Sequence, residues 1–530
     1  MIRRLLCLAL PLVAAVAFVP SLASAEPANS SAGAAPVQVV PEPSSLHTLP
    51  GQTYTLTPFT RIVVPAHSPD AAAAANYLAS VLRPSTGYRL PVTSGFSLPG
   101  DIRFAENGPA SLGEEGYTLN ATPLGVTISA HASAGLFYGV QTLRQLFPAK
   151  VESSSVQSGP WRAPGVVISD QPRFAWRGAM LDVARHFYSV SQVETYLNLL
   201  SMYKINVLHL HLSDNEGWRI YINGWSRLAT YGGSTNVDGG PGGYYTQADY
   251  QAIVAYAQAR HIMIVPEIDT PGHVTAAQAS YADLNCDGIA PPLLAPGYSS
   301  LCISDPVTYQ FLDAVVGQLA ALTPGPYIDM GGDEALNTSA SDYQTFVDKM
   351  QQIVASHGKK LLGWHQIEAG DLTSDDMVQY WGLSGSQPDI DLAQQAVARG
   401  NKIVMSPADR TYLDMAYNSS TIGQTWIGNP GYVSVSDGYN WDPATYVPGV
   451  GENDIAGVEA PEWTEDLGTV SLLQYMEFPR LPGYAEIGWS PQSARNWDTY
   501  KVRLAAQGPR WDVLGVNYYH SPEVPWPAKN

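Results

Sequence analysis

The carboxylates of Asp333 and Glu334 are the most informative candidates for chemistry, because they end the segment Tyr-Ile-Asp-Met-Gly-Gly-Asp-Glu. The chain has 47 acidic residues, so an Asp-Glu pair alone carries little information. The position of the pair after a strand-like run and two glycines is more informative, since glycine permits close approach of other groups to the backbone and unusual backbone angles. Successive strand residues point to opposite faces. The segment therefore places both carboxyls in one pocket only if the backbone bends there.

Polar, charged and Trp residues also collect at the ends of other strand-like runs. They are Asp182 and Arg185, His211 and Asp214, Glu267 and Asp269, Trp364 and His365, and Trp463 and Glu465. In a (β/α)8 barrel the carboxyl ends of the strands meet at one mouth, where active sites are built. The agreement among these runs predicts a single site at such a mouth.

Eight strand-like runs after Arg173 are expected to hold these residues. They are Ala179–Arg185, Val207–Asp214, Ile262–Asp269, Tyr327–Glu334, Leu361–Gln366, Met377–Gly382, Lys402–Ala408 and Ile455–Glu465. Helical stretches separate most of them, and the alternation predicts a parallel α/β barrel, the (β/α)8 or TIM barrel, over residues 173–530. A doubly wound open sheet also alternates, but it usually carries a G-x-G-x-x-G phosphate loop, which this sequence lacks.

Two of the intervening helices have recognisable starts. Ser191-Gln-Val-Glu194 has the pattern of a capping box, and the helix behind it has an apolar face. That face consists of Val193, Tyr196, Leu197 and Leu200. Asp305-Pro306 predicts the start of another helix, with Phe311, Val315, Leu319 and Leu322 on one stripe.

A small α/β domain is predicted to precede the barrel, over residues 37–172. Its expected strands are Arg61–Ala66, Tyr88–Val92 and Ile102–Phe104, its expected helices are Ala71–Leu82 and Ala134–Phe147, and a hairpin over Gly116–Ala130 turns at Thr122–Gly125. Residues 26–36 are rich in Ala, Ser and Pro and are typical of an unstructured leader.

The first 25 residues have the order of a secretory signal peptide, with Arg3 and Arg4, the apolar run Leu5–Val19, and Ala23-Ser-Ala25 before the expected cleavage point. The run is shorter than the roughly 20 residues that span a bilayer. We therefore expect a secreted or periplasmic protein. Cys7 falls inside the signal, which leaves Cys286 and Cys302, and in an exported protein the default for such a pair is a disulfide.

A net charge of -19 argues against nucleic acid and anionic membranes as partners, because both would repel the chain. The 13 Trp and 30 Tyr are a surplus of rings that can cover the apolar faces of sugars, although most aromatic residues belong to ordinary cores. Zinc is a further possibility, since His209, His211, Asp214, Asp269 and His273 offer ligand types. No H-E-x-x-H spacing occurs, and we expect no metal.

Several longer segments resemble the glycoside hydrolase family 20 β-N-acetylhexosaminidases. They are Arg177-Gly-Ala-Met-Leu-Asp-Val-Ala-Arg-His-Phe, His209-Leu-His-Leu-Ser-Asp-Asn-Glu-Gly-Trp-Arg, Pro266-Glu-Ile-Asp-Thr-Pro-Gly-His, Gly331-Gly-Asp-Glu, Gly363-Trp-His-Gln, Tyr380-Trp-Gly, Tyr412-Leu-Asp, Trp426 and Ala460-Pro-Glu-Trp-Thr-Glu. The resemblance runs from about Val37 to near the C-terminus. It is weakest over the N-terminal domain.

The resemblance implies substrate-assisted hydrolysis without a cofactor, in which the 2-acetamido oxygen of the sugar attacks the anomeric carbon. Glu334 would be the general acid and then the base for water. Asp333 would orient the acetamido N–H and stabilise the oxazolinium, while Tyr412 holds the acetamido oxygen. Asp214 and His273 would support Glu334 and keep its proton available. Adjacent carboxylates fit an ordinary retaining pair poorly, since such a pair flanks the glycosidic bond.

The resemblance also implies a pocket that closes around one terminal sugar. Trp364, Trp381 and Trp463 would form walls, with Trp426 at the pocket, and Arg185, Asp414 and Glu465 would bind ring hydroxyls. Such a pocket implies exo-action on terminal N-acetylglucosamine or N-acetylgalactosamine, in β-linked glycans or chitooligosaccharides. Asn215-Glu216 beside Asp214 is a mild departure from the family pattern. Trp176, Arg177 and Trp489 are expected to be structural.

Two alternatives remain open. A lacto-N-biosidase releases a disaccharide with the same groups and a longer pocket. A sugar-binding protein without turnover needs aromatic walls but no acid at Glu334, so the presence of that carboxyl favours catalysis.

Overall fold

The computed structural model describes residues 37–528. The expected signal peptide, residues 1–25 with Cys7, and the expected leader, residues 26–36, lie outside the described residues. Within the described part, no helix has both the length and the apolar character that a bilayer span requires.

The first domain is a seven-stranded mixed sheet with two helices. The strand order is β1 (Ser45–Leu56), β7 (Trp161–Asp170), β5 (Tyr117–Thr122), β6 (Gly125–Ala130), β4 (Ile102–Ala105), β2 (Ile62–Val64) and β3 (Val92–Ser94). Helices α1 (Pro69–Thr86) and α2 (Ser133–Leu146) contact each other and the sheet. The β5–β6 hairpin pairs Thr122 with Gly125, at the predicted turn.

Three expectations for this domain were incomplete or wrong. Strands β1 and β7 were not predicted, because β1 is mostly exposed with Pro50-Gly51 inside it and β7 contains Pro164-Gly165. The strand expected at Tyr88–Val92 is wrong, since Leu90 has a φ of 37° and pairing begins only at Val92. A positive φ takes the backbone out of the extended region that a strand requires.

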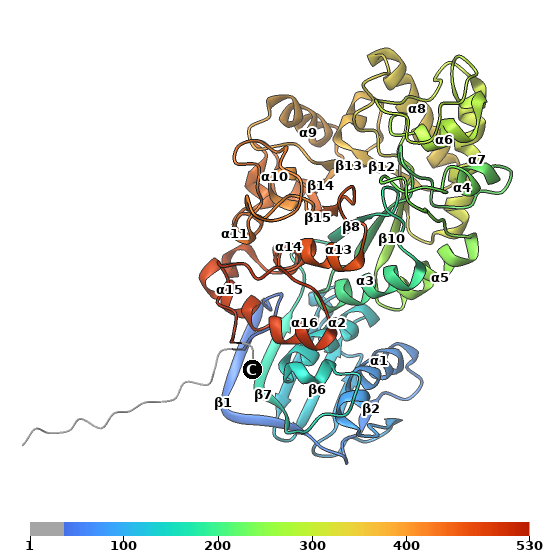
Figure 1. The fold of residues 1–530 in the computed structure, drawn as a ribbon. Coiled ribbons are helices and arrows are strands. Elements are labelled where there is room, and N and C mark those ends of the chain that lie inside the picture. Colours follow the sequence, from blue (N-terminus) through green and yellow to red (C-terminus); the bar gives the residue numbers. More distant parts are fainter. Residues whose placement is uncertain (1–36, 529–530) are drawn as a thin grey trace, which may run out of the picture. The chain divides into compact units, whose positions relative to one another are not determined.

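The second domain is a closed barrel of eight parallel strands (Figure 1). They are β8 (Trp176–Asp182), β9 (Val207–His211), β10 (Met263–Glu267), β11 (Tyr327–Asp329), β12 (Lys360–Trp364), β13 (Met377–Tyr380), β14 (Lys402–Met405) and β15 (Ile455–Glu462), and β15 pairs with β8 to close the ring. Each overlaps one of the eight predicted runs, although β8 begins three residues earlier and β12 one residue earlier than predicted. Asp182, His211, Glu267 and Trp364 are the last residues that their strands pair, or close to the last. Arg185, Asp214, Asp269, Asp333, Glu334, Trp463 and Glu465 follow the strand ends and stand on the loops of the mouth.

The helices of this domain alternate with the strands. They are α3 (Val190–Met202), α4 (Ser226–Thr230), α5 (Gln247–Gln258), α6 (Thr275–Ser280), α7 (Pro306–Leu322), α8 (Ala340–Ser356), α9 (Gln387–Arg399), α10 (Ala408–Thr411), α11 (Val435–Tyr439), α12 (Pro443–Tyr446), α13 (Val470–Glu477), α14 (Leu481–Trp489), α15 (Trp497–Ala505) and α16 (Gly508–Leu514). Asp305 caps α7 as predicted, and its side chain accepts from the Val307 amide.

The capping box expected at Ser191 and Glu194 is wrong. Helix α3 starts two residues earlier, and its box consists of Ser189 and Gln192. Both positions have the same pattern of a hydroxyl followed three residues later by a side-chain acceptor, so local sequence could not separate them. The apolar face is nevertheless the predicted one. Val193, Tyr196, Leu197 and Leu200 are all buried.

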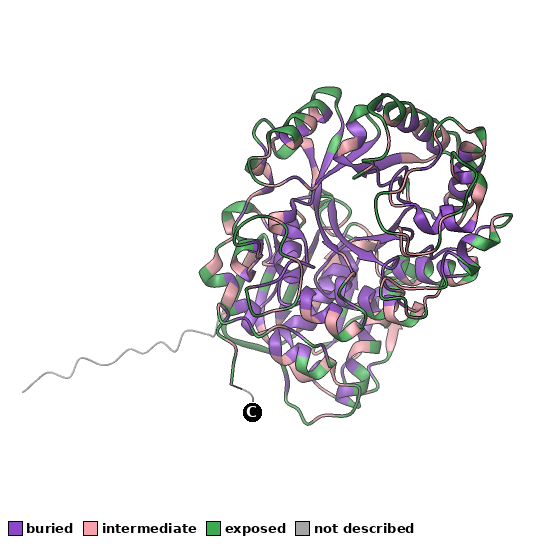
Figure 2. Cartoon of the chain, turned by 45° about the horizontal axis from the view of Figure 1, so that its top comes forward, coloured by how far each residue is buried: buried purple, intermediate pink, exposed green. Residues whose placement is uncertain are grey.

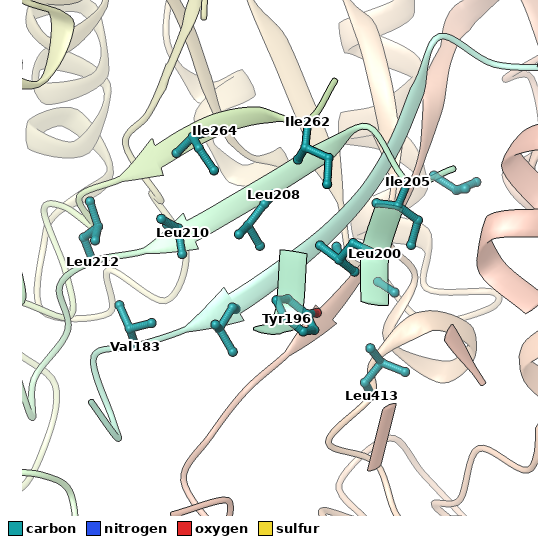
Figure 3. Close-up of a cluster of buried hydrophobic side chains, with 14 of the residues drawn as sticks. Val183, Tyr196, Leu200, Ile205, Leu208, Leu210, Leu212, Ile262, Ile264 and Leu413 are labelled. Carbon is teal, nitrogen blue, oxygen red and sulfur yellow. The ribbon is translucent and has the colours of Figure 1, made fainter. Parts of the chain in front are cut away.

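The main core lies between the barrel strands and their helices. Figure 3 shows Tyr196 and Leu200 of α3 beside Leu208 and Leu210 of β9. Figure 2 shows the strands buried and the outer helix faces exposed. Inside the ring, Trp176, Val207, Val265, Leu362, Met377 and Val404 form a separate apolar cluster. Rigid strands can therefore hold the polar groups at their ends in fixed positions.

Buried ion pairs join the two domains. Lys204 Nζ lies 3.0 Å from Asp170 Oδ2, and the Trp489 indole donates to Asp170 Oδ1 at 2.9 Å. The Arg177 guanidinium pairs with Glu115 at 2.6 Å. Arg177 and Trp489 therefore have structural contacts between the domains.

Candidate active site

A cavity of about 380 Å³ opens among the loops that follow the barrel strands. Its lining consists of Arg185, His273, Asp333, Glu334, Trp381, Tyr412, Asp414, Gln424, Trp426, Trp463 and Glu465. All except Gln424 are residues that the sequence singled out. The remaining two candidates, Asp214 and Trp364, are buried and contact the lining residues. The structure thus brings all twelve candidates into one site.

The bend expected at Gly331-Gly332 is present. Strand β11 ends at Asp329, and Gly331, Gly332 and Glu334 have φ values of 69°, 96° and 44°. A Cβ atom on Gly331 would lie 2.0 Å from Asp269 Oδ1, so only glycine fits there. This turn lets two adjacent carboxyls face the same cavity, at the cost of a left-handed conformation at Glu334.

His273 connects the two carboxylates to a buried third one. Its Nδ1 lies 3.2 Å from Asp214 Oδ1, and its Nε2 lies 3.6 Å from Asp333 Oδ2 and 3.5 Å from Glu334 Oε2. Burial opposes a charge on His273, but the carboxylates of Asp214, Asp269 and Asp333 raise its pKa well above the ordinary value. The ring is therefore an imidazolium at neutral pH.

The imidazolium changes the expected acidity of Glu334. The contact with the His273 ring is the main cause that lowers the pKa of Glu334, with partial burial acting in the opposite direction. Asp214 and His273 thus lie beside Glu334 as expected, and their role in keeping its proton available stays a prediction. Three carboxylates make His273 cationic, and a cation favours the ionised form of its neighbour.

Asp333 has a different environment on the same turn. Burial is the main cause that raises its pKa, and Glu267 and Glu334 raise it further against the effect of His273. Its Oδ1 is buried and has no hydrogen-bond partner among the described residues. An unpartnered buried acceptor in a cavity is a position for a ligand donor.

A chain of buried contacts lies beneath the pocket. His211 Nε2 lies 2.9 Å from Asp214 Oδ2, and His211 Nδ1 lies 2.5 Å from Glu267 Oε2. The second carboxylate oxygen of Glu267 accepts from the Trp364 indole at 3.1 Å. One buried network therefore fixes both Asp214, which holds His273, and Trp364, which forms part of the pocket wall.

The aromatic walls contact one another around the cavity. The centroids of Trp364 and Trp463 are 5.8 Å apart, those of Tyr412 and Trp463 are 6.3 Å apart, and those of Trp381 and Trp426 are 6.1 Å apart. Burial is the main cause that raises the pKa of Tyr412 well above its ordinary value. Its hydroxyl therefore remains a donor. Trp426 is 47% exposed and stands at the rim.

Arg185 lies among carboxylates at the other side of the pocket. Its guanidinium is 2.8 Å from Asp214, 3.3 Å from Glu216 and 3.8 Å from Glu465, and it covers the Trp463 ring at 4.9 Å. Glu216, the departure noted in the sequence, thus contacts Arg185 at the edge of the pocket. Burial, together with Asp214, raises the pKa of Glu216 to about 7.

Gln424 is the lining residue that the sequence analysis missed. Its amide nitrogen donates to the Asp414 carbonyl at 2.8 Å, and its side chain donates to Asp466 at 2.7 Å. The pairing with the Asp414 segment brings it to the pocket. The one available signal was its place two residues before Trp426, which is too weak to use alone.

Three groups of His, Asp and Glu in the described residues have ligand atoms within metal-binding distance of one another. They are His209, Glu267 and Asp329; His211, Asp214 and Asp269; and Asp269, His273 and Asp333. Each histidine already faces carboxylates through both ring nitrogens, and its pKa is raised well above the ordinary value. A metal requires a neutral imidazole nitrogen. The groups therefore fit a network of ion pairs better than a metal site.

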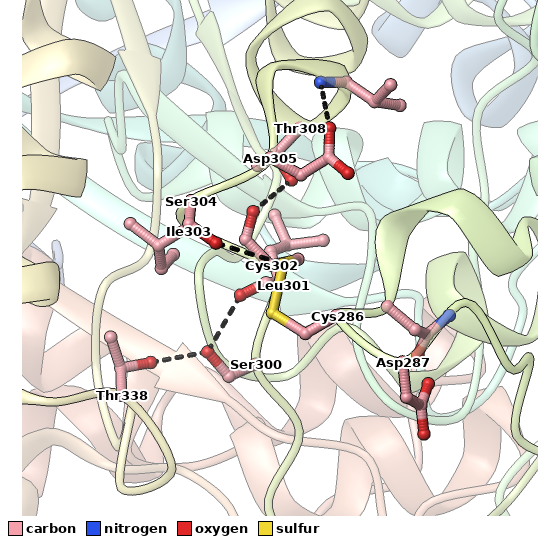
Figure 4. Close-up of a disulfide and its surroundings, with 12 residues drawn as sticks. Cys286, Asp287, Ser300, Leu301, Cys302, Ile303, Ser304, Asp305, Thr308 and Thr338 are labelled. Atoms are coloured by element: carbon pink, nitrogen blue, oxygen red, sulfur yellow. Dashed lines mark hydrogen bonds between the residues drawn. A yellow bond between two sulfur atoms is a disulfide. The ribbon is translucent and has the colours of Figure 1, made fainter.

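Cys286 and Cys302 form the expected disulfide, with Cα atoms 4.8 Å apart (Figure 4). It joins the ends of a long loop between α6 and α7. The Leu301 amide donates to the Pro271 carbonyl at 3.0 Å, two residues before His273. The stapled loop is thus attached to the segment that carries His273.

Comparisons with known proteins agree with this geometry. The profile of "Glycosyl hydrolase family 20, catalytic domain" matches residues 174–342 and 335–492, and that of "Glycosyl hydrolase family 20, domain 2" matches residues 36–171. The β-N-acetylhexosaminidase of Cellulomonas fimi is 38% identical over 498 residues, which cover 93% of this chain and 98% of that protein.

Two solved structures have a higher sequence identity to this chain than the Cellulomonas fimi protein has. The family 20 β-N-acetylhexosaminidase of Streptomyces coelicolor has a TM-score of 0.89 and 52% identity, covering 93% of this chain and 99% of that chain. A variant of the Streptomyces plicatus β-hexosaminidase in complex with its product GlcNAc has the same TM-score and identity, covering 93% and 98%.

Proposed function

This chain belongs to glycosyl hydrolase family 20 and is a β-N-acetylhexosaminidase, and from that premise we propose that it is a retaining exo-enzyme. It removes terminal non-reducing N-acetylglucosamine or N-acetylgalactosamine from β-linked glycans or chitooligosaccharides. The observation that carries the proposal is the pair on the Gly331-Gly332 turn, with Glu334 at the opening and the unpartnered Oδ1 of Asp333 facing inward.

The nucleophile in this proposal is the carbonyl oxygen of the 2-acetamido group. Asp333 Oδ1 accepts the acetamido N–H and Tyr412 donates to the acetamido oxygen, which directs that oxygen at the anomeric carbon. The C–O bond to the aglycone breaks, and Glu334 gives its proton to the departing oxygen. Water, deprotonated by Glu334, then opens the oxazolinium, so the product keeps the β configuration.

The electrostatics of the site support these assignments. Burial raises the pKa of Asp333 although the His273 cation acts in the opposite direction, so a further positive charge beside this carboxyl would stabilise its ionised form. A developing oxazolinium supplies that charge and is stabilised in return. A bound sugar removes water from Glu334, and desolvation raises the pKa of a carboxyl, which offsets the effect of His273 during the acid step.

Polar groups in the lining of the pocket support exo-action. Arg185, Asp414 and Glu465 line it, and Asp414 Oδ1 is buried with no hydrogen-bond partner among the described residues. Burial is the main cause that raises the pKa of Asp414. These groups can bind the hydroxyls of a single terminal ring, and a cavity of about 380 Å³ accommodates little more.

Hydrolysis of a series of β-linked substrates tests the proposal. We expect turnover of aryl β-N-acetylglucosaminides, near-inertness of aryl β-glucosides, and strong inhibition by a thiazoline analogue of the cyclised intermediate. Release of a disaccharide instead of a monosaccharide would indicate lacto-N-biosidase activity, and binding without turnover would indicate a sugar-binding protein. A stable ester on any carboxylate after treatment with a 2-fluoro glycoside would overturn the mechanism.

We also propose that the protein is exported and acts outside the cytoplasm. The support is the Arg3-Arg4 start, the apolar run and the Ala23-Ser-Ala25 sequence, together with a disulfide of the kind that persists in oxidising compartments. Mass measurement of the protein from a native culture tests this. A mature chain that begins at Glu26 is expected, and an intact Met1 with cytoplasmic retention would refute export.

A further inference from the structure

A second cavity, of about 610 Å³, lies between the disulfide loop and the segment that follows Glu334. We call it the outer cleft. One wall is the loop from Asn285 to Ser304, and the other runs from Asn337 to Asp342. Its lining is rich in hydroxyl and amide side chains, and the mechanism proposed above uses none of them.

The outer cleft is built onto the residues that surround Glu334. Leu336 and Asn337 are two and three residues after Glu334, and the Leu336 amide donates to the Glu334 carbonyl at 2.6 Å. Ser299 in the opposite wall donates to Asn215 at 2.8 Å, and Asn215 Nδ2 lies 3.4 Å from His273 Nδ1. The cleft therefore begins next to the proposed acid and its partner histidine.

The two walls are fixed to each other before any ligand binds. Ser300 and Thr338 share a hydrogen bond of 2.6 Å across the cleft, as Figure 4 shows, and Gln278 of α6 donates to the Ser300 carbonyl at 2.7 Å. The disulfide holds the base of the first wall. A preorganised cavity binds a ligand without a cost for ordering its loops.

The position of the acid gives the direction of the aglycone. The Glu334 side chain is 44% exposed, whereas those of Asp333 and Asp214 are 14% and 0% exposed. The glycosidic oxygen that Glu334 protonates must therefore lie on its outward side. The chain runs on from Glu334 through Leu336, whose amide bonds the Glu334 carbonyl, to Asn337 and Thr338 in the lining of the outer cleft.

The charge of the residues that line the outer cleft indicates which class of aglycone the cleft can bind. The described residues that line the outer cleft include Asp287 and Asp342 but no Lys, Arg or His. Each of the two carboxylates accepts a hydrogen bond, from the Ile289 amide and the Ser339 hydroxyl, and neither is paired with a cation there. Sulfated or otherwise anionic sugars are repelled by this lining, and a sugar amine is attracted.

We propose that the outer cleft is an aglycone subsite that binds the glycan beyond the scissile bond and selects neutral or amine-bearing sugars over anionic ones. This rests on the proposed function. Tyr298, which is 52% exposed in the lining, supplies a ring face for a sugar. Partly deacetylated β-linked N-acetylhexosamine oligosaccharides are the substrates that fit this lining best.

The first test compares four substrates that share a terminal β-N-acetylglucosamine, with an aryl, a neutral sugar, an amino sugar or a sulfated sugar as aglycone. At about pH 6 the amine is protonated. We expect kcat/KM to fall by about threefold from amine to neutral and again from neutral to sulfate, as for exposed charges near each other. Equal values for the three sugars would overturn the charge selection.

The matched variant is Asp287→Asn with Asp342→Asn, which keeps both hydrogen-bond acceptors and removes both charges. The order among the sugars should disappear, with hydrolysis of the aryl substrate unchanged. Asp498→Asn, far along the chain on α15, is the control and should keep the order. An order that survives in the double variant would show that other groups cause it.

A second variant tests occupancy of the cleft without charge. Tyr298→Ala should raise KM for a neutral tetrasaccharide by about tenfold, since base or sugar stacking on one ring contributes on that scale, and leave the aryl substrate unaffected. Phe59→Ala, an exposed ring in the first domain, is the control. No change in KM would refute the subsite. Failure to hydrolyse even the aryl substrate would instead refute the proposed function.

Discussion

Nε2 of His273 lies 3.5 Å from Oε2 of Glu334. The ring is held from behind by Asp214 at 3.2 Å, and three carboxylates keep it charged against the effect of burial. A cation is thus aimed at the proposed acid, and it lowers the pKa of that acid in the open pocket. This contact gives the pH dependence of the enzyme a specific cause.

His273→Asn should move the basic limb of the kcat/KM profile to higher pH. That limb reports the acid of the free enzyme, and removing the main cause of its lowered pKa raises it. Turnover should fall at the same time, because Glu334 loses its positioning contact. His357→Asn, a surface change at the end of α8, should leave the limb in place. An unchanged limb in His273→Asn would show that the imidazolium does not control Glu334.

Glu334→Gln should keep the fold and lose about 10²- to 10⁴-fold in kcat on substrates with poor leaving groups, the usual contribution of a general acid. Aryl substrates with very acidic phenols need less protonation and should lose far less in the first step. Steady-state kinetics on both substrate types, with circular dichroism for the fold, provides the measurement. Equal losses on both would exclude Glu334 as the acid.

Asp333→Asn should lower kcat by about 10²-fold or more, the scale for removing one preorganised group that stabilises developing charge. The amide cannot offer a negative charge to the oxazolinium, although its size is the same. Affinity for a thiazoline inhibitor should fall with it, measured by competition against an aryl substrate. Retained inhibitor affinity would separate Asp333 from the cyclised intermediate.

Reduction of the Cys286–Cys302 disulfide should lower the free energy of unfolding by about 3 kcal/mol, the chain-entropy value for a loop of this length. Urea unfolding of the oxidised and reduced protein gives the difference. Thiol titration of the denatured mature protein should find no free thiol before reduction, and two free thiols would contradict the bond.

Asp329→Asn should reduce the loss of stability between about pH 5 and pH 8. Burial is the main cause that raises the pKa of Asp329 to about 8. Its proton is bound more tightly in the folded state, so the associated stability is complete below the ordinary pKa and is lost as the pH rises through about 8. The amide carries no such proton, and its oxygen can still accept from Gly331.

Unfolding free energies of the Asp329→Asn variant and the parent at several pH values check this prediction. We expect the fall in unfolding free energy between about pH 5 and pH 8 to be smaller in the variant than in the parent, by on the order of 1–3 kcal/mol. Parallel curves would show that other groups titrate in this range. Asp375→Asn, at an exposed surface carboxylate, serves as the matched control.

The sequence alone predicted the features that depend on local pattern. All eight barrel strands overlap predicted runs, since burial on both faces leaves a continuous apolar signature. The sequence showed that a shared pocket for Asp333 and Glu334 requires a bend, and that the two glycines before them permit one. The Cys286–Cys302 pairing followed from counting cysteines. Most pocket residues were predicted because they terminate runs that a barrel must bring to one mouth.

Tertiary structure decided what depends on contacts between distant segments. Helix α3 has Ser189 as its N-cap and not Ser191. Strands β1 and β7 pair with each other although their own sequences are poor strand formers. Gln424 reaches the pocket through its bridge with Met415, in which its amide donates to the Asp414 carbonyl. The acidity of Glu334 is set by the charge on His273, which in turn requires Asp214, Asp269 and Asp333 to surround it. Electrostatic energies depend on distance and burial in space, and a linear sequence specifies neither.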